Sequence, residues 1–362
     1  MIKNITLVAA ARPNFMKIAP IVHELSKHSD FTYTLVHTGQ HFDHKMSDTF
    51  FNQLNIPEPD INLNIGGGSH AYQTGMVMIK FEEYLLKNKT DLVIVVGDVN
   101  STVACCISAK KCNIPVAHVE AGLRSFDRKM PEEINRILTD SISDILYTPS
   151  LDGDEQLLKE GIPKEKIVFV GNIMIDTLLK QAPAAEKISL NSLIKNPSKP
   201  YCLVTLHRPS NVDNINAFKN ILEAINHISK ELNIVWPIHP RSKKNAKSFG
   251  LWDSIQSNIE CINPLGYHEM MHLVSKSKCV ITDSGGLQEE TTVLNIPCIT
   301  VRENTERPIT ITEGTNSLAG TSKDDILKVY SNIENKRINS APKYWDGKTA
   351  QRIVSHLRDY LN

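Results

Sequence analysis

Short apolar runs alternate with longer amphipathic segments along almost the whole chain. The run 92–96 is apolar throughout, which is typical of a strand buried on both faces of a parallel sheet. Segments between such runs show helical spacing and start or stop signals. Predicted strands are 5–10, 33–37, 92–96, 114–119, 145–148, 167–170, 202–206, 234–238, 260–262 and 279–282. This alternation predicts an α/β protein with two parallel sheets.

The periodic pattern is interrupted between residues 181 and 200, where Pro183, Pro197 and Pro200 occur. We interpret this stretch as a linker. A chain of 362 residues is also too long for one ordinary core. We therefore predict a first domain over 1–178 and a second over 179–347.

Composition narrows the range of partners. Lysine plus arginine equals aspartate plus glutamate, 40 against 40, so no nucleic-acid or membrane partner is indicated. The apolar start is short and runs directly into Arg12-Pro13, so we interpret it as a strand rather than a signal peptide. Seven cysteines without a C-x-x-C pair favour reduced thiols and a cytoplasmic location.

Polar residues cluster directly after the predicted strands. In open parallel sheets, ligands bind beyond the carboxyl ends of the strands. Two such edges, one in each half, would form a cleft if they faced each other. The residues concerned are Arg12, His41, Asp98, Glu120, Asn172, His207, His239, Ser284 and Arg302.

The densest cluster is the stretch 118–136, and we interpret it as the candidate reaction centre. A predicted buried strand ends at Glu120, and Gly122 and Arg124 follow, which we expect to shape and neutralise this strand end. Glu132 and Arg136 are four residues apart, which fits either a surface ion pair or a carboxylate oriented at the cleft. Asp98 fits either a general base or a helix N-cap.

A second motif, Asp283-Ser-Gly-Gly-Leu-Gln-Glu-Glu290, is typical of phosphate binding at a helix N-terminus. Either glutamate could accept hydrogen bonds from a ribose, and the alternative is an ordinary capped helix. No G-x-G-x-x-G motif follows the first strand, which disfavours NAD. Three cations, Arg12, Lys17 and Arg307, are candidates for a diphosphate or for solvated helix ends.

Two histidine motifs lead to opposite interpretations. His207 ends the first strand of the second half and is a candidate acid or base, or a histidine that merely caps a strand. His268-Glu-Met-Met-His272 matches the zinc-protease helix, but no third ligand follows at the expected distance. We expect no metal there.

With these residues in view, the chain resembles the non-hydrolysing UDP-N-acetylglucosamine 2-epimerase family over nearly its whole length. The resemblance rests on many short motifs in one order. They are Ala11-Arg-Pro-Asn-Phe-Met-Lys17, Thr38-Gly-Gln-His41, Gly97-Asp98, His118-Val-Glu-Ala-Gly-Leu-Arg-Ser125, Pro131-Glu-Glu-Ile-Asn-Arg136, Gly171-Asn172, Leu206-His-Arg208, His239-Pro240, Thr282-Asp-Ser-Gly-Gly-Leu-Gln-Glu-Glu290 and Thr305-Glu-Arg-Pro308.

The resemblance implies two Rossmann-like domains of glycosyltransferase-B type, with the active site in the interdomain cleft. It further implies a C-terminal helix, 348–362, that packs on the first domain, a homodimer, and neither cofactor nor metal. The implied catalytic residues are Asp98, Glu120, Glu132 and His207. The implied substrate-binding residues are Arg12, Lys17, Ser284, Gly285, Gly286 and Arg307 for the diphosphate, Glu290 for the ribose, Leu265 and Met270 for the uracil, and His41, Arg136 and His239.

The family's chemistry suits these residue types. The C2 proton of a sugar is not acidic, so family members eliminate UDP across C1–C2 and add it back with the proton on the other face. One side chain takes the proton and another delivers it. The product would serve as a precursor of cell-surface polysaccharide.

The residues leave other functions open. Ala10-Ala11-Arg12-Pro13-Asn14 departs from the family's usual Gly-Thr-Arg-Pro-Glu, and Asn100 stands where threonine is common. A sibling group acts on UDP-linked 2,3-diacetamido uronic acids. Two alternatives come from other classes of function: a glycosyltransferase of the same fold and a nucleotide-sugar sensor.

Overall fold

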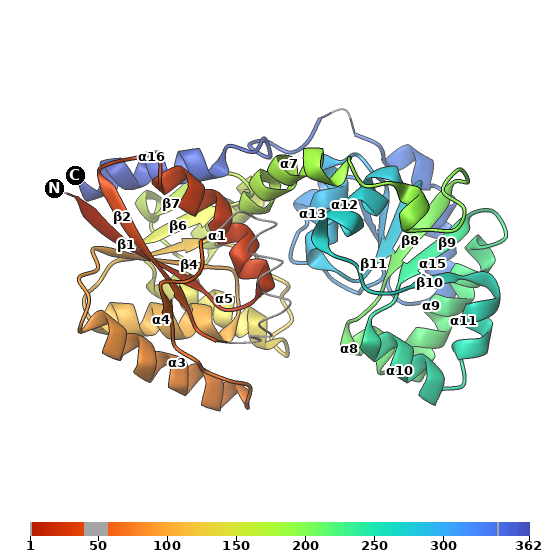
Figure 1. Cartoon of the computed structure of the whole chain (residues 1–362), viewed down its shortest axis with the longest axis horizontal. Coiled ribbons are helices and arrows are strands. Elements are labelled where there is room, and N and C mark those ends of the chain that lie inside the picture. The colour runs from red at the N-terminus through yellow and green to blue at the C-terminus, as the bar shows by residue number, and fades with distance from the viewer. Residues whose placement is uncertain (1, 40–56, 339) are drawn as a thin grey trace. The chain divides into compact units, whose positions relative to one another are not determined.

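The structure is a computed structural model that describes residues 2–39, 57–338 and 340–362 (Figure 1). It divides into two compact units, Met1–Thr177 with Lys343–Asn362, and Leu178–Pro342. His41 lies outside the described residues, and so does the side chain of Arg12.

The described part of the first unit forms a seven-stranded parallel sheet in the order β3-β2-β1-β4-β5-β6-β7. Its strands are β1 (Lys3–Ala9), β2 (Phe31–His37), β3 (Ile61–Asn62), β4 (Leu92–Val96), β5 (Val116–Val119), β6 (Ile145–Thr148) and β7 (Ile167–Phe169). Its helices are α1 (Arg12–Leu25), α3 (His70–Leu85), α4 (Asn100–Lys111), α5 (Pro131–Ile142), α6 (Leu151–Lys159), η1 (Lys164–Lys166), the start of α7 (Ile173–Ala185) and α16 (Thr349–Leu361).

The order of strands in this sheet reverses between β1 and β4. Strands β2 and β3 follow β1 toward one edge of the sheet, whereas β4 to β7 follow one another from β1 toward the opposite edge. Every residue of β4 is buried, because helices cover both faces of a parallel sheet. At such a reversal the loops after the two strands diverge and leave room for a ligand, so the carboxyl ends of β1 and β4 form a switch point.

The described part of the second unit forms a six-stranded parallel sheet in the order β10-β9-β8-β11-β12-β13. Its strands are β8 (Tyr201–Thr205), β9 (Asn233–Pro237), β10 (Glu260–Ile262), β11 (Cys279–Thr282), β12 (Cys298–Thr300) and β13 (Asn316–Leu318). Its helices are the end of α7, η2 (Leu190–Ser192), α8 (Pro209–Val212), α9 (Ile215–Ile228), α10 (Pro240–Ser248), α11 (Trp252–Asn258), α12 (Tyr267–Lys276), α13 (Gly285–Val293), α14 (Ile309–Thr312), α15 (Lys323–Tyr330) and η3 (Ile333–Lys336).

The second sheet has its own switch point, between β8 and β11. The two strands pair in parallel, with Thr205 opposite Thr282 at their carboxyl ends. The two threonine hydroxyls are 2.6 Å apart, which ties these strand ends together. One face of the sheet packs under α9, where Trp236 and Phe218 are fully buried, and the other packs against α12. The predicted fold class, α/β with two parallel Rossmann-like sheets, is confirmed.

The predicted linker is wrong at its start. Helix α7 continues to Ala185, so residues 181–185 are helical and Pro183 lies inside the helix. The helix persists because it buries an apolar stripe that includes Ile175 and Leu178. Pro183 falls in its last turn and interrupts little of the hydrogen-bond ladder.

The last helix of the chain, α16, belongs to the first unit and lies beside α1 (Figure 1). It buries Ile353, Val354 and Leu357. The Asp176 carboxylate of α7 accepts the backbone amides of Thr349 and Ala350 and so caps its first turn. In the described part of the chain, none of the helices is long and apolar enough to cross a membrane.

Candidate active site

A buried ion pair occupies the switch point of the first sheet. The Lys17 ammonium, on α1, donates to the Glu120 carboxylate, which follows β5, and both side chains are buried. The pair lies over Gly97, where an added Cβ would be 2.9 Å from Lys17 Nζ and 3.5 Å from Glu120 Oε2. Gly97 has a φ of +67°, and Asp98 follows it. Three predicted site residues, Lys17, Asp98 and Glu120, therefore meet at one strand edge.

Glu120 has a backbone conformation that is unusual for its residue type. Its φ is +76°, in the left-handed region that disfavours a side chain. Its amide and that of Ala121 both donate to the carbonyl of Tyr147, at 3.1 and 3.0 Å, which holds the sharp turn after β5. Such strain, on the order of 1–3 kcal/mol, is common where a functional side chain must be aimed.

A buried network lies under this turn. His118 donates from Nδ1 to Asp140, 2.6 Å away, and from Nε2 to the carbonyl of Gly97, 2.8 Å away. Since both ring nitrogens face acceptors, the imidazolium form satisfies both. The pKa of Asp140 is lowered although burial alone would raise it, because the charges and hydrogen bonds of His118 and Arg124 stabilise the carboxylate. His118 thus fixes Gly97, on which the ion pair rests.

The expected role of Arg124 is wrong. Its guanidinium contacts Asp140 at 2.7 Å and Glu160 at 2.7 Å, rather than Glu120. Lys17 supplies the cation beside Glu120 instead. Arg124 was predicted because it is close to Glu120 in the sequence, but the turn at Gly122 directs Arg124 away. Gly122 has a φ of +83°, and a side chain there would collide with the backbone of Gly153.

The ion pairs of Arg136 involve residues other than the predicted one. Its guanidinium contacts Asp98 at 2.5 Å and Glu133 at 2.7 Å. Glu133 is buried and accepts the amides of Ser125 and Phe126, so it anchors the loop after β5. Arg136 therefore orients Asp98, and the prediction that it orients Glu132 is wrong. Glu132 is partly exposed on the first turn of α5.

Asn14, the departure from the family's glutamate, is a buried bridge. Its Oδ1 accepts the amides of Ala10 and Ala11, at 3.3 and 3.0 Å, and its Nδ2 donates to the carbonyl of Val96 at 3.1 Å. The amide side chain therefore joins the ends of β1 and β4, which a carboxylate, lacking a donor, could not do.

In the second unit, a glycine turn joins β11 to α13. Ser284 is the N-cap residue, and Gly285 and Gly286 begin the helix with partly exposed backbone. A Cβ at Gly285 would lie 2.6 Å from Nη1 of Arg307, so glycine allows that guanidinium to lie against the turn. The first amides of α13 and a guanidinium together form an environment suited to a diphosphate.

Three arginines surround this turn, and one buried carboxylate holds them. Glu306 contacts Arg302 at 2.8 Å, Arg307 at 3.6 Å and Arg208 at 3.8 Å. Burial alone would raise the pKa of Glu306, but the hydrogen bond and charge of Arg302 and the charge of Arg307 hold it far below the ordinary value. Arg307 also contacts Glu289 at 2.7 Å. The cations are therefore fixed in place before any anion binds.

Glu290, the predicted ribose ligand, is buried in the second turn of α13. Burial, with the neighbouring charge of Glu289, raises its pKa to about 7, and the hydroxyl of Tyr267 donates to it at 3.4 Å. Leu265 and Met270, the predicted uracil contacts, are partly buried and pack at the margin of the core under α12.

Two histidines stand at the ends of adjacent strands. Nδ1 of His207 lies 2.9 Å from the fully buried carboxylate of Asp283, and the imidazole is 46% exposed. The His239 ring lies 6.1 Å away between centroids. Its Nδ1 accepts the amide of Arg241 at 3.1 Å, so its proton sits on Nε2. Burial, His207 and Arg241 lower the pKa of His239. The two rings thus present opposite groups, an acceptor at His207 and a donor at His239.

The first histidine of the H-E-x-x-H match serves another contact. His268 Nε2 pairs with the side-chain oxygen of Gln181 at 2.8 Å. Within residues 2–39, 57–338 and 340–362, no group of three or more histidine, cysteine or acidic side chains is placed to hold a metal ion.

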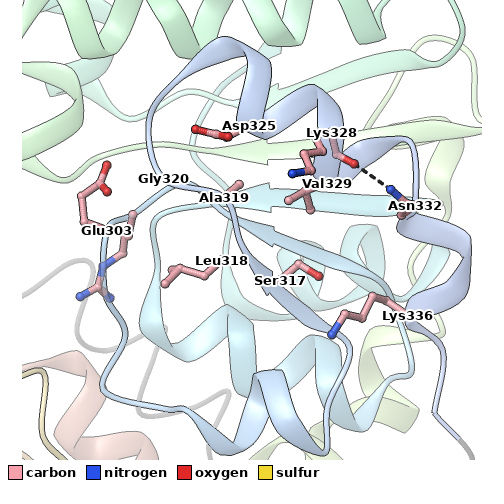
Figure 2. Close-up of a pocket in the computed structure, with 11 residues that line it drawn as sticks. Glu303, Ser317, Leu318, Ala319, Gly320, Asp325, Lys328, Val329, Asn332 and Lys336 are labelled. Carbon is pink, nitrogen blue, oxygen red and sulfur yellow. Dashed lines mark hydrogen bonds between the residues drawn. The ribbon is translucent and has the colours of Figure 1, made fainter.

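A hollow of about 600 Å³ lies elsewhere, along β13 and α15 (Figure 2). Its charged groups mostly have local partners: Asp325 with Ser322, Glu303 with Thr321, and Arg302 with Glu306. Of the polar residues predicted at strand ends, Arg302 lines it, and its guanidinium is held by Glu306. The groups do not converge on a ligand, so we assign this hollow no role.

Several functional candidates were missed from the sequence. Asp283 was part of a quoted motif but received no role, and Glu133 was overlooked beside Glu132. His118 and Asp140 looked like ordinary buried positions in a strand and a helix. For His118 the available signal was a polar residue inside an otherwise apolar strand.

Parallel sheets in two units, each with polar groups at a switch point, define the glycosyltransferase-B class of folds. Acinetobacter baumannii MurG shares this fold, with a TM-score of 0.58 at 12% identity over 99% of both chains.

Closer similarities identify the family. The family model for UDP-N-acetylglucosamine 2-epimerase matches residues 23–358. The UDP-N-acetylglucosamine 2-epimerase of Methanocaldococcus jannaschii is 44% identical over 98% of both chains. A crystal structure of Methanocaldococcus jannaschii UDP-GlcNAc 2-epimerase in complex with UDP-GlcNAc and UDP has a TM-score of 0.90, covering 98% of this chain and 99% of that one. The chain belongs to the UDP-N-acetylglucosamine 2-epimerase family and is an isomerase.

Proposed function

We propose that the protein interconverts UDP-N-acetylglucosamine and UDP-N-acetylmannosamine by reversible epimerisation at C2. The observation that carries this proposal is the pair of switch points. One gathers Asp98, Glu120 and Lys17, and the other joins a glycine turn to an exposed histidine. The first supplies carboxylates for proton transfer, and the second supplies the features of a diphosphate site. The similarity to UDP-N-acetylglucosamine 2-epimerases supports the substrate.

The reaction divides into elimination and addition. A base takes the proton from C2, the electron pair of that C–H bond forms the C1–C2 double bond, and the C1–O bond breaks with its electrons leaving on UDP. Readdition of UDP to the glycal, with a proton delivered to the opposite face of C2, completes the epimerisation. Asp98, Glu120, Glu132 and His207 are the proposed proton carriers. The sum is redox-neutral, so we propose that neither cofactor nor metal takes part.

The leaving diphosphate gains charge as the C1–O bond breaks. We assign its stabilisation to Arg307, Ser284, Gly285, Gly286 and Lys17, with Arg12 as a further cation. Glu290 would hold the ribose, Leu265 and Met270 would line the uracil site, and His41, Arg136 and His239 would complete the substrate contacts.

We propose a homodimer as the working form. Helices α3 and α5 carry large apolar side chains that are exposed in the isolated chain, namely Tyr72, Ile79, Ile134 and Leu138. Both helices pack against α4, and exposed apolar residues of this kind are typical of a subunit interface. Sedimentation should give twice the chain mass, and Ile79→Lys should shift the species toward the monomer; a monomeric wild type would overturn this proposal.

We also propose a cytoplasmic location. All seven cysteines are free thiols, and five of them are buried. Free thiols persist in reducing compartments. Fractionation of the native host should recover the protein and its activity in the cytoplasm; recovery outside it would contradict the proposal.

A second candidate substrate has its own support. The UDP-2,3-diacetamido-2,3-dideoxy-D-glucuronate 2-epimerase of Pseudomonas aeruginosa is 40% identical over 98% of this chain and 99% of its own length. The reaction would be the same, with a sugar that carries a second acetamido group and a carboxylate.

The deciding experiment is incubation in deuterated water with either UDP-sugar, followed by NMR of the sugar protons. We expect deuterium at C2 and two epimers from UDP-N-acetylglucosamine. Exchange with the diacetamido uronate alone would support the second candidate. Absence of exchange with both sugars would reject epimerase activity.

A further inference from the structure

The buried carboxylate of Asp283, at the second switch point, has no role in the proposed reaction so far. Asp283 follows β11 and is fully buried. It accepts the backbone amides of His207 at 3.0 Å and Arg208 at 2.9 Å, and the side-chain amide of Asn211 at 3.2 Å. Its other contact is the imidazole of His207, at 2.9 Å from Nδ1.

The direction of that last hydrogen bond follows from the acceptor. An ionised carboxylate only accepts, so Nδ1 of His207 must carry the proton. The pKa of Asp283 is lowered although burial alone would raise it, because the hydrogen bond and charge of His207 stabilise the ionised form. Nε2 then carries the lone pair of the neutral ring. No partner for Nε2 is present in the described part of the chain, and the ring is 46% exposed.

We propose that Asp283 is the positioning residue for His207, fixing its Nδ1–H tautomer so that Nε2 serves the substrate as proton acceptor and donor. When Nε2 takes a proton, the ring becomes an imidazolium, and the carboxylate behind it stabilises that charge. Readdition takes its proton from an acid on the opposite face of C2, and the imidazolium loses its proton to solvent before the next cycle; in the reverse reaction Nε2 is the donor. This inference rests on the proposed epimerase function, because that function makes His207 a proton carrier.

The surroundings favour a positioning role over a purely electrostatic one. His239 faces His207 with its own proton on Nε2, held there by the amide of Arg241. His239 thus has a fixed donor at Nε2, and His207 has a fixed acceptor at Nε2. Such an arrangement suits a site in which one histidine accepts a proton and the other donates a hydrogen bond. The Arg208 guanidinium donates from Nε to the backbone carbonyl of Asp283 at 3.0 Å and lies 3.8 Å from Glu306, so it leaves the Asp283 carboxylate to His207. Fixed orientation of a histidine by a carboxylate is a general device in proton-transfer sites.

A loop-holding role for Asp283 makes different predictions. Its bonds to two backbone amides and to Asn211 would stabilise the turn even if the imidazole contact had no function. Asn211→Ser removes one of these structural bonds and leaves the imidazole contact intact, so it is the matched structural control. Asp253→Asn, on the exposed first turn of α11, makes the same charge change far from the histidines in the chain and is the charge control.

The first measurement needs no activity. Imidazole nitrogen shifts of histidine-labelled wild type, recorded at alkaline pH and assigned by loss of signal in His207→Gln, report the tautomer directly. We expect Nδ1–H in the wild type, Asn211→Ser and Asp253→Asn, and a shift toward Nε2–H in Asp283→Asn. An Nε2–H tautomer in the wild type overturns the proposal, even if Asp283→Asn does not fold.

The second measurement is the rate of deuterium exchange at C2. In Asp283→Asn we expect kcat to fall roughly 100-fold with KM changed less than about threefold, because substrate binding does not involve the carboxylate. Wild-type kcat in this variant overturns the proposal. If the wild type itself shows no exchange, the proposed function fails, and the tautomer measurement alone then decides the role of Asp283.

Discussion

The two switch points occupy the same position in their sheets but carry different chemistry. In the first unit, the carboxylate of Glu120 is buried against Lys17, on a backbone in the left-handed region. In the second, the carboxylate of Asp283 is buried behind a histidine that is half exposed. The first unit thus has a buried ion pair at the carboxyl ends of its strands. The second keeps the charge inside and presents a titratable ring outside.

The difference shows how one topology supports both halves of a reaction. Elimination of a diphosphate requires a base for a weakly acidic proton and a stable site for the leaving anion. Carboxylates gathered at a strand edge suit the first requirement, because a carboxylate can accept a proton. A glycine turn with arginines fixed by Glu306 suits the second, because those cations are already oriented when charge develops.

The largest effect is expected from Glu120→Gln. Removal of the carboxylate should lower C2 deuterium exchange about 1,000-fold, equivalent to about 4 kcal/mol, if Glu120 transfers a proton. Glu24→Gln is the matched control, because Glu24 lies on the same helix as Lys17 and pairs with the exposed Lys27 just beyond that helix. Exchange at the wild-type rate in Glu120→Gln would remove this residue from the proposed catalytic set.

The next effect concerns Glu290, whose pKa is raised to about 7 from an ordinary value of 4.5. Between these two pH values the native state binds more protons than the unfolded state, so the free energy of unfolding falls as pH rises through that window. Glu290→Gln removes this penalty. Its free energy of unfolding should exceed that of the wild type at pH 8, by on the order of 2–3 kcal/mol, and match it at pH 4.

Urea unfolding at the two pH values measures this difference. Glu223→Gln, at an exposed position on α9, should follow the wild type at both pH values. Equal stability of Glu290→Gln and the wild type at pH 8 would mean that the buried carboxyl carries no such penalty.

A smaller effect is expected from Gly97→Ala at the first switch point. The φ of +67° disfavours any side chain, and the new methyl would lie 2.9 Å from Lys17 Nζ. We expect a loss of about 1–2 kcal/mol in the free energy of unfolding, measured by urea titration, together with slower exchange. Gly67→Ala, where an added methyl meets nothing within 4 Å, is the control. Wild-type stability in Gly97→Ala would show that the ion pair moves easily.

The smallest effect is expected in the hollow of Figure 2, away from the glycine turn. Lys328→Ala should leave kcat and KM for exchange within about twofold of the wild type, because the hollow gathers no convergent set of ligands. A change in KM confined to this variant would extend the substrate site of the second unit to its sheet edge.

The sequence predicted best those features that depend on residues adjacent in the chain. Continuous apolar runs such as 92–96 predict parallel strands, and polar residues at their ends predict binding edges, because both depend on neighbours in the chain. The glycine turn after β11 was predicted for the same reason. The predicted linker began too early, inside α7, because Pro183 was given more weight than the apolar stripe of that helix.

Ion-pair partners were predicted least well, because they depend on contacts between distant segments. Lys17 and Glu120 are 103 residues apart, and nothing local indicates their pairing. Arg124 is four residues from Glu120, but the left-handed turn directs it to Asp140. Asp283 and His207 are likewise brought together only by the pairing of β8 with β11. Strand order, rather than residue spacing, decides these contacts.

Helix α16 gives the molecule an order of assembly during synthesis. The second unit is one continuous segment, so all of its residues leave the ribosome together. The first unit must wait for the last residues of the chain, because α1 remains uncovered until Ile353, Val354 and Leu357 arrive. The half of the protein translated first is therefore completed last, and the apolar face of α1 stays exposed on the nascent chain until then.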